Sequence, residues 1–158
     1  MVSPTIESRS SFSPTEDGAA LDRALKASRP PNGTIFLQTS TQGHGQLTIE
    51  NGSKFDALVK LISPQRKYTF ISVYIHAGRS ATVTNIRPNT YKLVFAFGEG
   101  WDDSRNAMVR IASTAAFDKL LTFIRSQEQY TSFKVTLHPV VGGNTQSVAI
   151  SKEDFLAY

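Results

Sequence analysis

The three histidines are the first residues to consider for catalysis or metal binding. His44, His76 and His138 are far apart in the chain, and none stands at metal-ligand spacing from another. No serine lies in the Gly-x-Ser-x-Gly sequence of a nucleophile elbow. A Ser-His-Asp site is recognised by geometry, so a hydrolase with a spatially assembled site stays a third alternative. We expect no catalytic residue, no metal ligand, and histidines at surface or turn positions.

Two further features bear on cofactors. The chain has no cysteine, which excludes disulfides, thiolate metal cages, cysteine nucleophiles and thiol switches. Oxygen donors gather in the segment 101–106, Trp-Asp-Asp-Ser-Arg-Asn. This segment lacks the alternating donors and the distant glutamate of an EF-hand, so an Asx-type turn beside a tucked Trp101 is favoured over a calcium loop. We expect no cofactor.

Basic and aromatic residues in the middle of the chain form the candidate binding surface. Residues 46–99 hold seven Lys or Arg against three Asp or Glu, an excess equal to the net charge of +4 of the whole chain. Tyr68, Phe70 and Tyr74 would share one side of an extended strand, either buried in a central strand or left as an aromatic platform. The candidate binding residues are Arg66, Lys67, Tyr68, Phe70, Tyr74, His76, Arg79, Arg87 and Lys92.

Short β-favouring runs separated by turn residues must position these side chains. Apolar alternation and β-branched residues predict strands near 34–38, 46–50, 57–62, 68–76, 81–86, 91–97, 108–112, 132–138 and 147–150. Gly, Asn and Pro predict turns at 51–52, 77–78, 88–89, 98–100 and 142–144. The pattern predicts an all-β fold, a single antiparallel β-sandwich of about seven to nine strands over residues 34–158.

Two segments are less regular. Residues 1–33 are rich in Ser, Pro and Thr and predict a mostly disordered tail or linker, with a short amphipathic helix possible at 17–27. Residues 117–124 match both helical spacing and strand alternation. Their β neighbours favour a strand there.

The run 77–93, Ala-Gly-Arg-Ser-Ala-Thr-Val-Thr-Asn-Ile-Arg-Pro-Asn-Thr-Tyr-Lys-Leu, resembles the hairpin of carboxypeptidase regulatory-like, or transthyretin-like, domains. The chain from Gly45 onward is also similar to bacterial C-terminal β domains of unknown function, through Asn51-Gly52 and Trp101-Asp102. Asn89-Thr90 departs from the Pro-Gly or Asp-Gly pair usual in that turn. The resemblance implies a prealbumin-like sandwich that serves as an accessory module, with no catalytic residue.

These observations favour a non-catalytic interaction or accessory module whose partner is a protein. The alternative is a glycan- or polyanion-binding domain that uses the aromatic or basic surface. No apolar run has the length of a membrane span or of a signal peptide core, so we expect a soluble domain in a compartment that the sequence leaves open.

Overall fold

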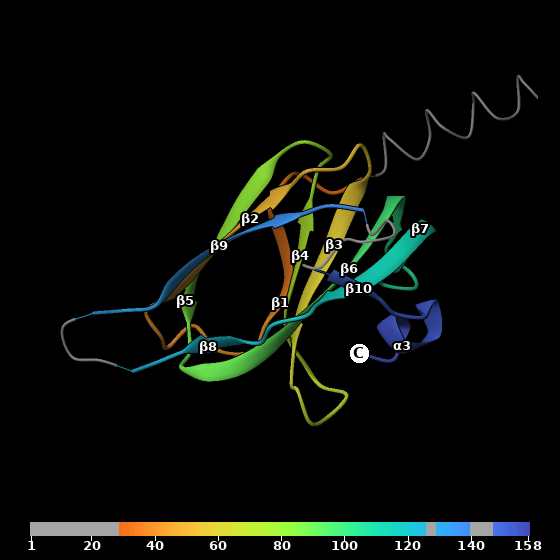
Figure 1. The fold of residues 1–158 in the computed structure, drawn as a ribbon. Helices are drawn as coiled ribbons and strands as arrows, with labels where there is room; N and C mark the ends of the chain where they lie inside the picture. The colour runs from red at the N-terminus through yellow and green to blue at the C-terminus, as the bar shows by residue number, and fades with distance from the viewer. Residues whose placement is uncertain (1–28, 126–128, 140–146) are drawn as a thin grey trace, which may run out of the picture.

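Two β-sheets face each other in the computed structural model, which describes residues 29–125, 129–139 and 147–158 (Figure 1). The strands are β1 (Thr34–Gln38), β2 (Gly45–Asn51), β3 (Asp56–Ile62), β4 (Thr69–Ile75), β5 (Ser80–Ile86), β6 (Asn89–Asp102), β7 (Ala107–Phe117), β8 (Leu121–Phe123), β9 (Ser132–Leu137) and β10 (Ser147–Ala149). The large sheet has the order β1-β4-β3-β6-β7-β10 with β8 paired to β6, and the small sheet has the order β5-β2-β9. The predicted all-β sandwich is confirmed.

The sheets differ from the prediction in two respects, the direction of one strand pair and the number of strands. The small sheet contains a parallel pair, β2 with β9, in register from Gln46 opposite Ser132 to Asn51 opposite Leu137. The sandwich is therefore not purely antiparallel. The described residues contain ten strands rather than seven to nine, because the ambiguous segment 117–124 includes the three-residue strand β8. The preference for a strand there is confirmed.

An inner core fills the space between the two sheets. The small sheet contributes Leu47, Ile49 and Val83, and β6 contributes Leu93 and Phe95, all at most 1% exposed. Along β2, Leu47 and Ile49 alternate with half-buried residues, as the two faces of a strand with one face in the core require. Burial of this apolar surface is the main stabilising contribution to the sandwich.

A second, outer core lies on the opposite face of the large sheet, beneath the helix α3 (Lys152–Leu156) (Figure 1). Phe155 of α3 is fully buried there against a cluster that includes Val94 and Trp101. This helix was not predicted from the sequence. Ser151 begins it by accepting a hydrogen bond from the Asp154 backbone N–H at 3.0 Å, the arrangement that an N-cap serine makes.

A bulge in β4 changes which side chains share a face. Leu61 of β3 pairs with Ile71 and Ile62 pairs with Thr69, so Phe70 is an extra residue on β4. Phe70 packs against the inner core, whereas Tyr74 is fully buried in the outer core. The prediction that Tyr68, Phe70 and Tyr74 share one side is wrong, because one inserted residue reverses the alternation. The alternative of a strand buried on both faces is confirmed for β4 between Ile71 and Ile75.

The turn predicted at 98–100 is also wrong. β6 runs through these residues to Asp102, and Gly98 lies at a shift in register opposite β7. A Cβ atom at Gly98 would overlap the backbone carbonyl oxygen of Arg110, so the glycine permits close strand approach rather than chain reversal. The reversal comes after Asp102, whose Oδ1 accepts hydrogen bonds from the Ser104 N–H and hydroxyl at 3.0 and 2.6 Å. The Asx-type turn beside a buried Trp101 is confirmed.

The chain makes domain contacts from Arg29 onward, before the predicted boundary at residue 34. The side-chain amide of Asn32 accepts a hydrogen bond from the His76 N–H at 2.8 Å and donates one to the Ser80 carbonyl at 2.9 Å. The Gly33 N–H donates to the Tyr74 carbonyl at 2.8 Å. The possible helix at 17–27 and the turn at 142–144 lie outside the described residues.

Candidate functional site

Four loops meet at one end of the sandwich, and we call this surface the loop end. Its described residues are 39–44, 63–68, 87–88, 124–125 and 129–131. They lie together because β1, β3, β5 and β8 all finish at this end before the chain turns back. Loops held by a rigid sheet are a common location for binding residues.

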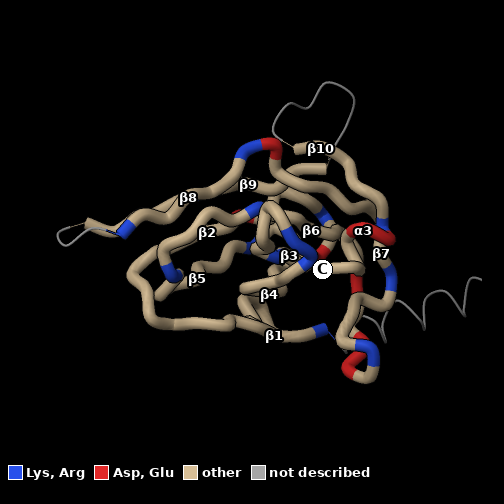
Figure 2. Tube along the Cα trace, turned by 90° about the horizontal axis from the view of Figure 1, so that it is seen from below, with Lys and Arg blue, Asp and Glu red and all other residues tan. Residues whose placement is uncertain are grey.

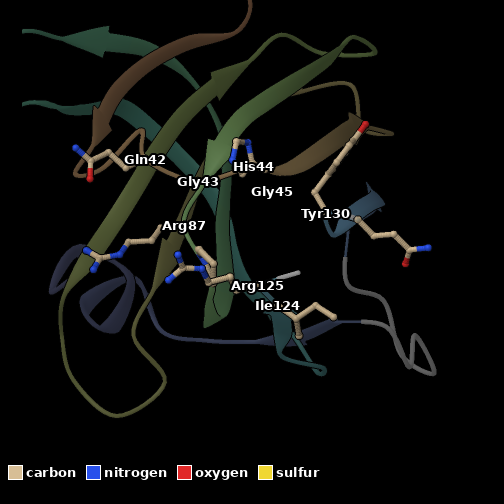
Figure 3. Close-up of a pocket in the computed structure, with 10 residues that line it drawn as sticks. Gln42, Gly43, His44, Gly45, Arg87, Ile124, Arg125 and Tyr130 are labelled. Carbon is tan, nitrogen blue, oxygen red and sulfur yellow. The ribbon is translucent and has the colours of Figure 1, made fainter. Parts of the chain in front are cut away.

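Three adjacent hollows cover the loop end. The first, of about 470 Å³, is lined by residues that include His44, Arg87, Arg125 and Tyr130 (Figure 3). The second, of about 370 Å³, lies between Arg66 and Asn89. The third, of about 450 Å³, shares Arg87 with the first and Tyr68, Phe70 and Asn89 with the second. The three hollows therefore form one continuous surface.

Local contacts fix the backbone at Arg66 and Arg87 in the loop end. The Ser63 hydroxyl oxygen accepts hydrogen bonds from the backbone N–H groups of Gln65 and Arg66, both at 3.2 Å, which fixes the turn that carries Arg66. The Tyr91 hydroxyl donates to the Arg87 carbonyl at 2.7 Å. A Cβ atom at the buried Gly43 would overlap the backbone of Ile86 and Arg87, so glycine is needed where these loops touch.

The charge at the loop end is positive. Arg66, Lys67, Arg87 and Arg125 are exposed there, and the described residues of the four loops include no Asp or Glu. Within the part of the chain that the structure describes, none of these four side chains forms an ion pair with a carboxylate. In Figure 2 the described residues at the end of the molecule near β5 and β8 include Lys or Arg and no Asp or Glu.

The opposite end of the sandwich differs in charge. There Asp56, Glu99 and Asp102 are paired with Arg29, Arg110 and Arg105 at 3.2, 3.7 and 3.7 Å. Three arginines at this end therefore have carboxylate partners, although Arg79 is exposed there without one among the described residues, whereas none of the four described cations of the loop end has such a partner. The loop end therefore combines several exposed cations with no carboxylate among its described residues, which favours attraction of anions.

Three aromatic rings in edge-to-face contact lie at the centre of the loop end. Tyr68 is 47% exposed and meets Phe70 edge to face at a centroid distance of 4.7 Å. Phe70 in turn meets Tyr91 edge to face at 5.3 Å, and Tyr91 is buried in the inner core. One exposed ring is thus held in position by two rings behind it.

The structure brings five of the nine predicted binding residues together and separates the others. Arg66, Lys67, Tyr68 and Arg87 belong to the loop end, and Phe70 of β4 lines two of its hollows. Lys92 lies nearby, half-buried on the outer face of β6 opposite Ile62, and lines none of the three hollows. Arg79 is exposed in the β4–β5 turn at the opposite end, since β4 runs the full height of the sheet between them.

Tyr74 and His76 belong to a buried polar cluster at that opposite end. The Tyr74 hydroxyl donates to Asp56 Oδ2 at 2.9 Å, and the Ala77 N–H donates to Asp56 Oδ1 at 2.9 Å. His76 Nε2 lies 2.6 Å from the Pro30 carbonyl oxygen. Burial, the negative charge of Asp56 and the hydrogen bond to it raise the pKa of Tyr74 above its ordinary value. Tyr74 is fully buried and not available to a ligand, whereas His76 is half-buried and held by its contact with the Pro30 carbonyl.

His44, Asn89, Arg125 and Tyr130 also line the loop end and were missed as binding residues. His44 was assigned to a loop without a role, and Arg125 and Tyr130 lie outside the basic stretch 46–99. The sequence did indicate a loop there, because Arg125 and Tyr130 flank a polar segment between two β-favouring runs. The sequence did not indicate which other loops this segment would meet.

The described residues include no group of three His, Cys, Asp or Glu side chains that could hold a metal ion. Among the same residues no helix is long and apolar enough to cross a membrane. Comparison with models of protein families, with curated proteins and with solved structures gives no significant match. Any assignment of function therefore depends on the loop end itself.

Proposed function

We propose that this chain is a non-catalytic binding domain that holds an anionic polymer on its loop end. The observation that supports this is the gathering of Arg66, Arg87 and Arg125 around three connected hollows without a carboxylate among the described lining residues. Unpaired arginines at an exposed surface favour ligands with carboxylate, sulfate or phosphate groups, which accept two parallel hydrogen bonds from a guanidinium.

The continuity of the surface supports a polymer rather than a small ligand. The hollows are open and adjoin one another through shared residues, Arg87 on one side and Tyr68 with Asn89 on the other. Small-molecule sites are deeper and mostly apolar, with few polar groups. A chain molecule can instead lie across several shallow positions, each of which contributes a weak contact.

The test is salt-dependent retention of the purified chain on immobilised dextran sulfate and immobilised polyglutamate. We expect retention that falls linearly as the logarithm of salt concentration rises, because polyanion binding releases counterions. The triple variant Arg66→Gln, Arg87→Gln, Arg125→Gln should lower that slope by up to about three, roughly one for each lost ionic contact.

A second triple variant with the same change in net charge is the control. Arg79→Gln, Arg105→Gln, Lys152→Gln alters exposed side chains away from the loop end. Its slope should match that of the unmodified chain. An equal loss in both triple variants would show that net charge alone causes retention, and no retention beyond a basic protein of similar size would also refute the proposal.

A further inference from the structure

We infer that the anionic polymer is an acidic polysaccharide, with a sugar ring stacked on Tyr68 and acidic groups placed against Arg66 and Arg87. This inference rests on the proposed function and names its ligand class. It starts from the position of Tyr68, which lines both the second and the third hollow, with Arg66 in one and Arg87 in the other. The exposed ring therefore lies between two arginines.

The Tyr68 ring is suited to stacking because it is exposed and also held. Its exposure is 47%, and the edge-to-face contact with Phe70 at 4.7 Å leaves part of the ring open to a ligand. A preorganised ring loses little conformational entropy when a ligand packs on it. The apolar face of a sugar ring can cover such a surface while its hydroxyl groups stay at the rim.

The polar groups beside Tyr68 match a ligand rich in hydroxyl groups. Asn89 lines both flanking hollows, and its Oδ1 accepts the Thr90 N–H at 2.8 Å. Within the described residues its Nδ2 group has no hydrogen-bond partner, so it can donate to a ligand. Gln65 in the second hollow and Gln42 in the first are exposed amides, which both donate and accept. A ligand hydroxyl group can use both donors and acceptors of the protein, whereas the anionic groups of a polyanion without hydroxyl groups use donors only.

A single-stranded nucleic acid fits this arrangement less well. Such ligands stack successive bases on successive aromatic rings. In the second and third hollows Tyr68 is the one exposed ring, since Phe70 is half-buried behind it and Tyr91 is buried. The other exposed tyrosine of the loop end, Tyr130, lines the first hollow only. One ring with a cation on each side corresponds to one sugar with acidic groups nearby.

The experiment is affinity electrophoresis of the full chain in gels that contain alginate, dextran sulfate, polyglutamate or oligo(dT). The variants are Tyr68→Ala, Tyr68→Phe and, as a matched exposed tyrosine of the loop end, Tyr130→Ala, with Tyr130 at 60% exposure. We expect Tyr68→Ala to weaken binding to at least one of the two polysaccharides by about tenfold or more, the order of one lost stacking contact. Tyr68→Phe should bind as the unmodified chain does, and polyglutamate binding should not change in any of the three variants.

The outcomes separate this inference from the proposed function. If every polymer binds according to its charge density and Tyr68→Ala has no effect, the polysaccharide assignment is overturned while polyanion binding stands. Tightest binding to oligo(dT) with dependence on Tyr68 would assign a nucleic acid instead. An equal loss in Tyr130→Ala overturns the placement on Tyr68, and binding to none of the four polymers refutes both proposals. Unchanged thermal unfolding of the variants would show that the substitutions leave the fold intact.

Discussion

Asp56 shows at the scale of single residues how the domain tolerates a buried charge. Its carboxylate is 4% exposed and accepts hydrogen bonds from Tyr74 and the Ala77 backbone, at the end of β4 and in the turn after it, and from Arg29, which is far away in the sequence. Burial of a carboxylate without partners is costly, so each donor contributes to stability. Tyr74 is therefore an internal structural residue, in agreement with the burial that its position in an apolar strand favoured over an exposed platform.

Replacement of Tyr74 with Phe tests this role through pH. The raised pKa of Tyr74 means that above about pH 10, the ordinary pKa of tyrosine, the unfolded chain releases this proton while the folded chain keeps it. The unfolded state then binds fewer protons, so this group lowers the free energy of unfolding as pH rises above 10. At neutral pH we expect Tyr74→Phe to cost about 1 to 3 kcal/mol, because Asp56 loses a donor.

Urea unfolding measured from pH 7 to 11 checks this prediction. The stability of the unmodified chain should fall more steeply above pH 10 than that of Tyr74→Phe, so the two curves converge. Tyr68→Phe is the control, since it removes the hydroxyl of an exposed tyrosine. Parallel curves for Tyr74→Phe and the unmodified chain would contradict the assignment of a buried, hydrogen-bonded phenol.

The helix α3 shows at the scale of elements how a short segment depends on its contacts. Its five residues are too few for a stable isolated helix. Lys60, in the middle of β3, donates hydrogen bonds to the Phe155 and Tyr158 carbonyls at 3.3 and 3.2 Å and lies 4.3 Å from the centroid of the Phe155 ring. The lysine thus satisfies carbonyls at the helix C-terminus, where a positive charge is favourable.

Phe155→Ala tests the docking of α3. Phe155 is fully buried, so its truncation should leave a cavity in the outer core and cost about 3 to 5 kcal/mol. The adjacent Leu156 is 50% exposed, so Leu156→Ala should cost no more than about 1 kcal/mol. Urea denaturation of both variants provides the measurement, and similar losses would show that the helix is not held through Phe155.

At the scale of the whole molecule, the inner and outer cores share the large sheet. β3 places Val59 and Leu61 in the inner core and Leu58 and Ile62 in the outer core. β4 and β6 likewise contribute to both cores. Neither core can lose its packing without disturbing a sheet that the other requires.

We therefore expect a single cooperative unfolding transition. The only tryptophan, Trp101, lies in the outer core and reports on it by fluorescence, whereas far-ultraviolet circular dichroism reports on both sheets. The two probes should give coincident thermal transitions. Phe95→Ala, a substitution in the inner core, should shift both transitions downward together. Separate midpoints for the two probes would show that the cores unfold independently.

The sequence by itself determined the all-β class, the approximate position of most strands, and the basic and aromatic residues from Arg66 to Arg87. These features were predictable because side-chain alternation and turn chemistry act over a few neighbouring residues. The N-cap Ser151 carried a local signal of the same kind for α3, and it was overlooked.

Only the tertiary structure decided which residues meet. The bulge at Phe70, the parallel pairing of β2 with β9, and the assembly of the loop end from segments between residues 39 and 131 all depend on long-range strand order and register. A one-residue shift costs little in local propensity but transfers a side chain to the other face of a sheet, and burial of the entire core selects among such registers. For this reason Tyr68 and Tyr74, six residues apart in a single β-favouring run, have different environments, one exposed at the loop end and one fully buried.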